Sequence, residues 1–159
     1  MKHKQSIKYL NSLGIILLVL FSFLAMANPA PNLSKLNEEH AHPGYFRLVN
    51  DAKRRITEIS VHKLAEKLKS GVPFYLIDVR ESEENKQGAI PKSIHLSKGI
   101  IESDIEQKIP DYNADIVVYC RSGKRSALVA DNLQKMGYHH VSSLKGGFQA
   151  WVKAGLPST

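Results

Sequence analysis

The sequence contains one cysteine, Cys120, among its 159 residues. A single cysteine excludes an internal disulfide, the usual means by which small exported domains are stabilised. Cys120 is therefore a buried inert residue, a link between two molecules or a reactive thiol. Composition alone favours the inert residue, because free cysteines are among the most buried residue types.

The sequence also has only a small excess of charge and no clustered basic face. Its 22 basic and 15 acidic residues give a net charge of +7, and three of the lysines lie within the first eight residues. Without those three lysines the balance is 19 basic against 15 acidic residues, a net charge of +4. A mildly basic chain of this kind is not typical of nucleic-acid binders, so we expect no nucleic-acid partner.

Histidine clusters that suit a metal ion are lacking as well. The two closest groups are His40-Ala-His42 and His139-His140, and neither has a cysteine nearby in the sequence. Adjacent residues of a regular strand point to opposite faces, so His139 and His140 cannot both bind one ion. We expect surface histidines, no metal and no cofactor.

No apolar run reaches the roughly 20 residues that a membrane-spanning helix requires. The longest run begins at Leu13 and leads to the small residues Ala25-Met-Ala27, and a short basic stretch precedes it. This pattern predicts a signal peptide over residues 1–27, and the lack of a cysteine near the cut excludes lipid modification there. The alternative is an uncleaved membrane anchor. We expect a monomeric, periplasmic or secreted protein that has no membrane contact once the leader is cleaved.

Residues 28–159 are enough for one domain with a normal core. Residues 28–43 are rich in Pro, Asn and His without an apolar period, which predicts a flexible N-terminal segment. Over residues 44–159, strand-like apolar segments alternate with segments of helical periodicity. This alternation predicts an α/β domain whose central parallel sheet of about five strands is covered by helices on both faces. Strands are expected at 56–59, 72–79, 93–96, 115–120 and 140–144, and helices at 44–55, 61–70 (between Ser60 and Gly71), 100–109, 126–136 and 146–154.

Cys120 stands at the end of a predicted buried strand, shortly before a predicted helix. In open parallel sheets, ligands bind beyond the carboxyl ends of the strands. Gly123 lets the turn curl so that successive N–H groups point into one concavity, and the helix that begins near Ser126 adds its positive end. Fixed positive charge comes from Arg121, Lys124 and Arg125. All three effects favour a thiolate and an anionic ligand, so the local sequence indicates a reactive Cys120.

Four motifs carry a resemblance to a known family. They are Ile77-Asp-Val-Arg-Glu81, Gly88-Ala-Ile-Pro-Lys-Ser93, Ile116-Val-Val-Tyr-Cys-Arg-Ser-Gly-Lys-Arg-Ser126, and Leu144-Lys-Gly-Gly-Phe-Gln-Ala-Trp151 followed by Ala154-Gly-Leu-Pro157. In this order, over a core of residues 56–157, they strongly resemble the rhodanese family and its single-domain thiosulfate sulfurtransferases of the bacterial periplasm. The chain departs from the family pattern at Ala89, where histidine is usual, and at Lys92, where glycine is usual.

The resemblance implies a sulfurtransferase. Such an enzyme moves a sulfane sulfur from thiosulfate or a persulfide, through a persulfide on Cys120, to a thiol, cyanide or protein acceptor. The resemblance also implies a structural role for Asp78 and Arg80, with the arginine paired to a nearby acid such as Glu83. It implies that the loop after the cysteine binds the small anionic donor, through Arg121, Ser122, Gly123, Lys124, Arg125 and Ser126.

Two alternatives remain at this point. The chain could be a persulfide carrier or binding module for a partner protein, with little turnover of free donors. It could also resemble the phosphatases and arsenate reductases of the same fold, which place an arginine after five intervening residues to enclose a tetrahedral anion. Only four residues separate Cys120 from Arg125, and this shorter loop favours sulfur chemistry.

Overall fold

The computed structural model describes Glu38 and residues 40–159. The predicted signal peptide and the predicted flexible segment up to residue 37 lie outside the described residues, so both remain predictions. Within the described part of the chain, no helix is long and apolar enough to span a membrane. Residues 42–159 form one unit; of the other unit, residues 1–41, only Glu38, His40 and Ala41 are described, and all three are helical.

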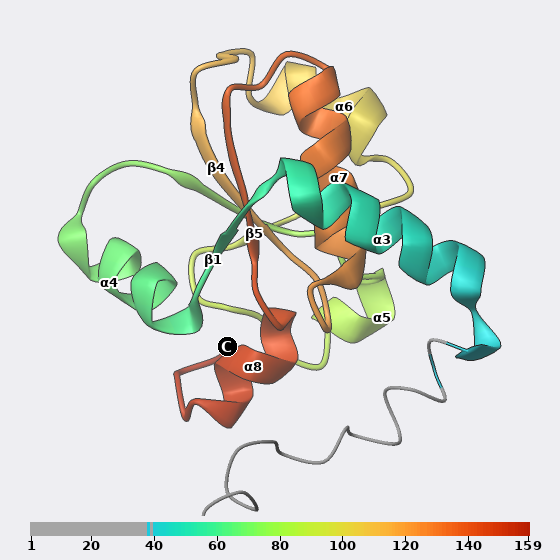
Figure 1. The fold of residues 1–159 in the computed structure, drawn as a ribbon. Helices are drawn as coiled ribbons and strands as arrows, with labels where there is room; N and C mark the ends of the chain where they lie inside the picture. The colour runs from blue at the N-terminus through green and yellow to red at the C-terminus, as the bar shows by residue number, and fades with distance from the viewer. Residues whose placement is uncertain (1–37, 39) are drawn as a thin grey trace, which may run out of the picture. The chain divides into compact units, whose positions relative to one another are not determined.

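Five parallel strands form the sheet of the second unit, in the order β1-β5-β4-β2-β3. Figure 1 shows the fold, with β1, β4 and β5 labelled. Their bounds are β1 (Thr57–Ile59), β2 (Tyr75–Asp78), β3 (Ile94–His95), β4 (Asp115–Tyr119) and β5 (His140–Leu144). The predicted α/β fold is confirmed. β5 has the predicted bounds, and each of the other four strands is shorter than predicted. Residues 72–74 do not join β2, because Pro73 has no N–H to donate to a neighbouring strand and Val72 is 59% exposed.

Helices occupy every segment where one was predicted. Their bounds are α3 (Pro43–Arg55), α4 (Val61–Ser70), α5 (Ser82–Asn85), α6 (Ile101–Lys108), α7 (Lys124–Lys135) and α8 (Gly147–Lys153). The hydroxyl of Ser60 accepts the N–H of Lys63 at 3.2 Å and so caps α4, and Gly71 ends that helix with a φ of +73°. The short helix α5 was not predicted, and α7 begins two residues before the predicted Ser126.

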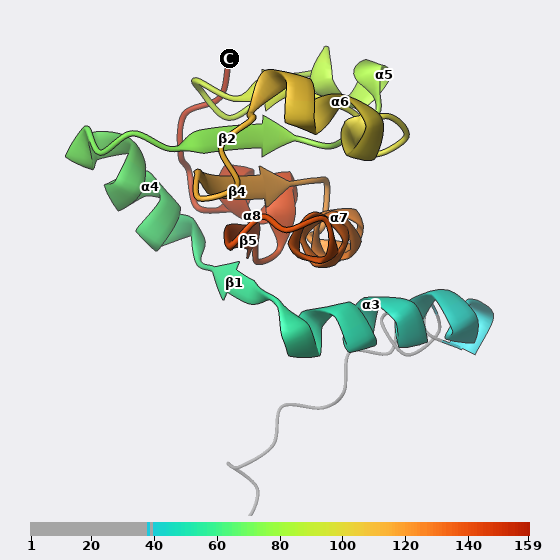
Figure 2. The ribbon, with the colours of Figure 1, turned by 90° about the horizontal axis from the view of Figure 1, so that it is seen from above.

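The helices cover both faces of the sheet, as predicted (Figure 2). On one face, Ile105 of α6 and Val129 of α7 belong to the same buried cluster as Val118 of β4. On the other face, Leu64 of α4 and Trp151 of α8 belong to a cluster that includes Val117 of β4. Because both faces of β4 are buried, packing fixes the position of the residue that follows it, which is Cys120.

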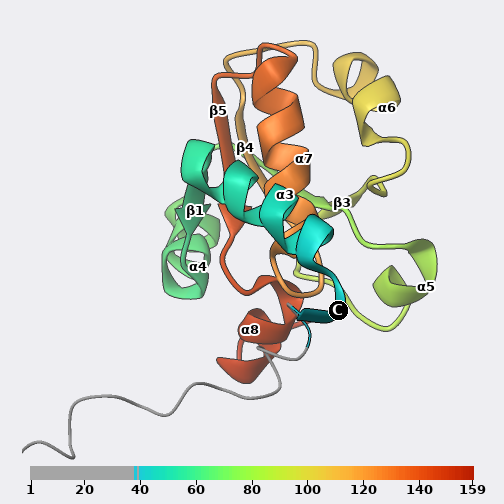
Figure 3. The same ribbon diagram turned by 45° about the vertical axis from the view of Figure 1, so that its right-hand side comes forward.

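α3 packs against α7 at the edge of this core (Figure 3). Val49 and Ala52 are buried there. At the end of α3, Arg55 donates to both carboxylate oxygens of Asp131 at 2.7 Å, and Lys135 donates to the same carboxylate at 2.6 Å. The bonds from Arg55 outweigh burial and hold the pKa of Asp131 at about 2.

Replacing Asp131 with asparagine is expected to lower the free energy of unfolding by about 1–2 kcal/mol at pH 7, a range that allows for solvent screening at the half-exposed Arg55. The folded state favours the charged carboxylate. This stabilisation is therefore complete above the ordinary Asp pKa of 3.8 and is lost as the pH falls through about 2. Urea unfolding of the wild type and of Asp131→Asn, at pH 7 and at pH 3, measures the difference between their free energies of unfolding. This difference should be roughly halved at pH 3.

The matched control is Asp51→Asn, which removes an exposed carboxylate of α3 that pairs with Arg54 on the same helix. It is expected to cost no more than about 0.5 kcal/mol. If Asp131→Asn lowered the free energy of unfolding by the same amount at both pH values, that result would contradict the proposed charge pairing.

Candidate active site

Cys120 directly follows β4, at the edge of the sheet where β2 ends at Asp78 and β5 ends at Leu144. The residue is 1% exposed. Its sulfur accepts two hydrogen bonds from Ser126, one from the backbone N–H at 3.4 Å and one from the hydroxyl at 3.6 Å. Ser126 lies in the first turn of α7, so the positive end of that helix is directed at the sulfur. Two donors aimed at one sulfur suit a negatively charged sulfur better than a neutral thiol.

The loop between Cys120 and α7 presents backbone donors. Gly123 adopts a φ of +84° just before the helix, which only glycine does without strain. The N–H groups of Arg121, Ser122 and Gly123, and that of Arg125 in the first turn of α7, donate to no acceptor among the described residues. Donors of this kind at a helix N-terminus are available to an anion.

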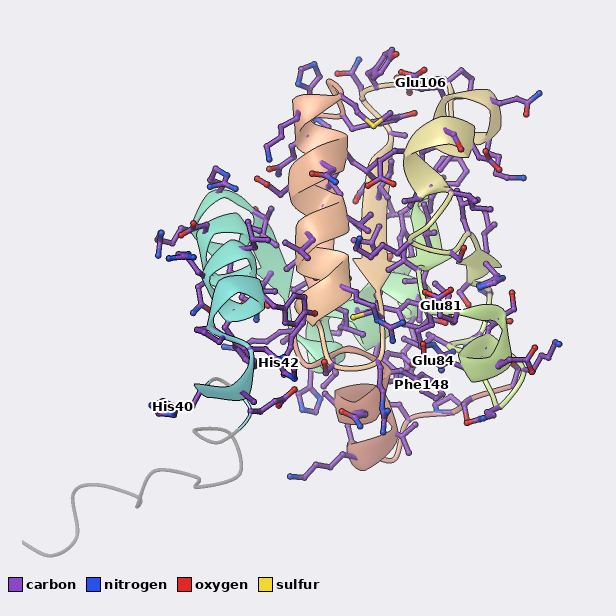
Figure 4. The ribbon with its side chains drawn as sticks, turned by 90° about the vertical axis from the view of Figure 1, so that its right-hand side faces the viewer. His40, His42, Glu81, Glu84, Glu106 and Phe148 are labelled. Atoms are coloured by element: carbon purple, nitrogen blue, oxygen red, sulfur yellow. The ribbon has the colours of Figure 1, made fainter. Side chains whose placement is uncertain are left out.

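Arg125, one of the predicted donor-binding residues, is already paired. Its guanidinium donates to both carboxylate oxygens of Glu84 in α5, at 2.6 and 2.7 Å, and lies 3.7 Å from Glu81. Glu81 and Glu84 are labelled near α5 in Figure 4. This bond lowers the pKa of Glu84 and raises that of Arg125. The charge of Arg125 is therefore largely compensated within the protein, and its role in binding a donor remains a prediction.

The other predicted donor-binding side chains lie in different surroundings. The ammonium of Lys124 lies 4.4 Å from the ring centre of Phe46 in α3. Arg121 is exposed to solvent, and Ser122 is half-buried. The roles of all three in donor binding remain predictions.

The backbone of α8 binds the segment that follows β4, which is Cys120 and the loop of residues 121–123 (the cysteine loop). The N–H of Phe148 donates to the carbonyl of Cys120 at 2.8 Å, and the N–H of Gln149 donates to the carbonyl of Arg121 at 3.0 Å. Gly147, which begins α8, has a φ of +58°. A Cβ at residue 147 would lie only 2.3 Å from the Cys120 carbonyl oxygen, so this close approach requires glycine.

Gly147→Ala is expected to destabilise the protein by about 2–4 kcal/mol, because it adds a left-handed alanine and pushes the cysteine loop away from α8. Gly155→Ala is the matched control. Gly155 has a similar φ of +68°, but a Cβ there would meet nothing within 4 Å. Its cost should be limited to the backbone, about 1 kcal/mol. Urea unfolding measures both values, and equal losses in the two variants would contradict the close packing at Gly147.

The structure corrects the expected partner of Arg80. Arg80 is 3% exposed and pairs with Asp78, at 2.5 Å, whereas Glu83 pairs with Lys86 on the surface. The Arg80 guanidinium also donates to the backbone carbonyls of Glu84 at 3.0 Å and of Gly88 at 2.6 Å. These contacts are structural and hold α5 beside the cysteine loop.

Sequence reasoning missed three contributors to the site. Glu84 pairs with Arg125, Gly147 packs on the Cys120 carbonyl, and Ser143 bonds to the Ser126 hydroxyl. The only available signal was the Gly146-Gly147 pair, since two consecutive glycines at the start of a helix indicate a close backbone approach. Among residues 38 and 40–159, no three metal-ligating side chains gather in one place.

The fold and the site together define a class of protein: parallel α/β domains in which a cysteine follows the central strand and precedes a short loop at a helix N-terminus. The chain belongs to the rhodanese-like domain family, whose model matches residues 60–154. The resemblance found in the sequence is thereby confirmed. The match begins after α3 and β1.

Individual relatives agree with this assignment. The chain is 36% identical over 102 residues to a protein of Allochromatium vinosum named "Sulfurtransferase", covering 64% of this chain and 94% of the relative. It is 41% identical over 96 residues to YtwF of Bacillus subtilis, which is provisionally named a sulfurtransferase, covering 60% and 90%. A solved protein of unknown function from Rhodopseudomonas palustris, described as a possible tyrosine phosphatase, matches with a TM-score of 0.66 and 30% identity, covering 73% and 94%.

Proposed function

We propose that this protein is a rhodanese-type sulfurtransferase that carries the transferred sulfur on Cys120. The observation that supports this most strongly is the setting of the Cys120 sulfur, which is buried at the end of β4 and accepts two hydrogen bonds from Ser126. The names of the Allochromatium vinosum and Bacillus subtilis relatives point to the same chemistry. The place of action that we propose, the periplasm or the cell exterior, rests on residues 1–27 alone.

The proposed reaction has two steps. In the first, the Cys120 thiolate attacks the outer sulfur of a donor such as thiosulfate. A bond forms between the two sulfurs, the S–S bond of thiosulfate breaks, and sulfite leaves with its electron pair. In the second, an acceptor such as cyanide or a thiolate attacks the outer sulfur of the persulfide, and Cys120 leaves as a thiolate. The protein returns to its starting state, so the cycle needs no further oxidant or reductant.

The residues around Cys120 have defined roles in this proposal. The Ser126 donors and the N–H groups of the loop stabilise negative charge on the sulfur, both as thiolate and as persulfide. Four residues lie between Cys120 and Arg125, which suits a single transferred sulfur better than a phosphate. This spacing argues against a phosphatase reaction, although one structural neighbour is described as a possible tyrosine phosphatase.

Mass spectrometry of the intact protein after thiosulfate treatment tests the proposal. The protein should gain about 32 Da, one sulfur atom, and release sulfite. Oxidation to a sulfinic acid adds nearly the same mass, so cyanide must then remove the added mass as thiocyanate. No mass gain and no sulfite, or hydrolysis of an aryl phosphate instead, would overturn the proposal. Loading without turnover by cyanide or a thiol would indicate the alternative, a persulfide carrier for a partner protein.

A further inference from the structure

A hydrogen-bonded pair of serines lies behind the nucleophile. Ser143 of β5 and Ser126 of α7 are both fully buried, at 0% exposure. The hydroxyl of Ser143 donates to the hydroxyl oxygen of Ser126 at 2.9 Å. The Ser126 hydroxyl in turn donates to the Cys120 sulfur at 3.6 Å. Three buried side chains, from β5, from α7 and from the residue after β4, thus form one chain of hydrogen bonds that ends on the Cys120 sulfur.

The order of donation in this chain decides where the Ser126 proton points. A serine hydroxyl has one proton and two lone pairs, and it rotates to suit its neighbours. A serine in a helix can donate instead to a carbonyl of the preceding turn. Because Ser143 donates to Ser126, the Ser126 oxygen is held as an acceptor on that side, and its own proton is left for the sulfur. The incoming bond also polarises the Ser126 O–H and strengthens its donation.

We propose that Ser143 is a positioning residue, which fixes the Ser126 hydroxyl as a donor to the Cys120 sulfur. Ser143 touches no reacting atom and acts only through Ser126. Its effect on the thiolate is independent of the substrate, whereas its effect on the persulfide rests on the proposed function. Ser143 follows Val141 on the face of β5 that packs on α7, and Ser142 between them points to the opposite face.

Alkylation of Cys120 by iodoacetamide, followed from about pH 5 to about pH 9, tests the thiolate part. Cys120 is the only cysteine, so the rate reports on this site alone. Ser143→Ala is expected to move the midpoint of the pH profile upward and, at pH values below the wild-type midpoint, to slow alkylation about three-fold. Ser126→Ala should slow it further. The double variant should be no slower than Ser126→Ala, because Ser143 acts through Ser126.

Ser142→Ala is the matched control, with the same chemical change one residue away on the other face of β5, and it should alkylate at the wild-type rate. Removing one buried oxygen leaves a smaller apolar side chain, so Ser143→Ala should fold. A purely structural role would lower its melting temperature without moving the pH profile. Two results would overturn the proposal. One is a Ser143→Ala variant with the wild-type alkylation rate and pH midpoint. The other is a double variant that is slower than Ser126→Ala by the same factor by which Ser143→Ala is slower than the wild type.

Thiosulfate loading of the same variants separates this proposal from the proposed function. If wild-type protein takes up no sulfur but the alkylation rates follow the expected pattern, only the proposed function fails. If wild-type protein loads sulfur and Ser143→Ala loads it equally fast with an unchanged alkylation profile, only the positioning role fails.

Discussion

Serine in place of Cys120 is expected to abolish sulfur transfer while leaving the fold intact. A serine hydroxyl is not ionised at neutral pH and is a far weaker nucleophile toward sulfur than a thiolate. The variant keeps the Ser126 donors and the loop N–H groups, so it removes only the atom on which the sulfur would be carried. We expect no mass gain after thiosulfate treatment and sulfite release below about one-thousandth of the wild-type rate.

Unfolding in urea provides the control for this variant. The oxygen is smaller than the sulfur and can accept the same hydrogen bonds, so the free energy of unfolding should change by no more than about 1 kcal/mol. Cys120→Ser contains no thiol at all, because the chain has no other cysteine. Sulfur loading of this variant would therefore place the carrier on a different group and contradict the assignment of Cys120.

The sheet and most helices could be predicted because each depends on a local pattern. The apolar run of β4 is buried on both faces, and Ser60 and Gly71 mark the ends of α4 by their capping chemistry. α5 has no such pattern, since Ser82–Asn85 contains no apolar residue. Its stability comes from reciprocal bonds between Glu81 and Glu84 and from the Arg80 guanidinium, which donates to its backbone. Contacts of this last kind cannot be read from a local sequence.

The site also has a part that depends on local sequence and a part that depends on contacts between distant residues. Cys120, its loop and the helix that follows are contiguous in the sequence, so the place of this cysteine beside backbone donors could be predicted from spacing. The partners of the first turn of α7 are distant in the sequence: Glu84 lies 41 residues before Arg125, and Ser143 lies 17 residues after Ser126. Which side chains meet where the strands end depends on the strand order, and the sequence pattern does not determine that order.

The Asp78–Arg80 pair should dominate the stability of this end of the domain. Asp78 is 0% exposed and Arg80 3%, and Asn85 adds a hydrogen bond to the carboxylate at 2.9 Å. Burial opposes the charge of Asp78, but the bonds from Arg80 and Asn85 outweigh it and lower the pKa of the carboxyl. The stabilisation is therefore complete above the ordinary Asp pKa of 3.8 and is lost as the pH falls below it.

Asp78→Asn is expected to lower the free energy of unfolding by about 3–5 kcal/mol at pH 7, because it leaves the Arg80 guanidinium buried without a counter-charge. Domains of this size are stable by about 5–15 kcal/mol, so the variant would be close to unfolding. Urea unfolding measures the loss. Glu83→Gln is the matched control, since Glu83 is exposed and pairs with the exposed Lys86, and it should cost no more than about 0.5 kcal/mol.

A double variant separates the cost of an unpaired charge from the cost of lost packing. Asp78→Leu with Arg80→Met removes both charges and replaces them with apolar side chains, so it should be more stable than Asp78→Asn. The double variant nevertheless loses the bonds from Arg80 to the carbonyls of Glu84 and Gly88, and with them the hold on α5. Because Glu84 binds Arg125 in the first turn of α7, beside Ser126, alkylation of Cys120 should change in the double variant even where its stability recovers. An Asp78→Asn protein as stable as Glu83→Gln would show that the buried pair has little effect on stability.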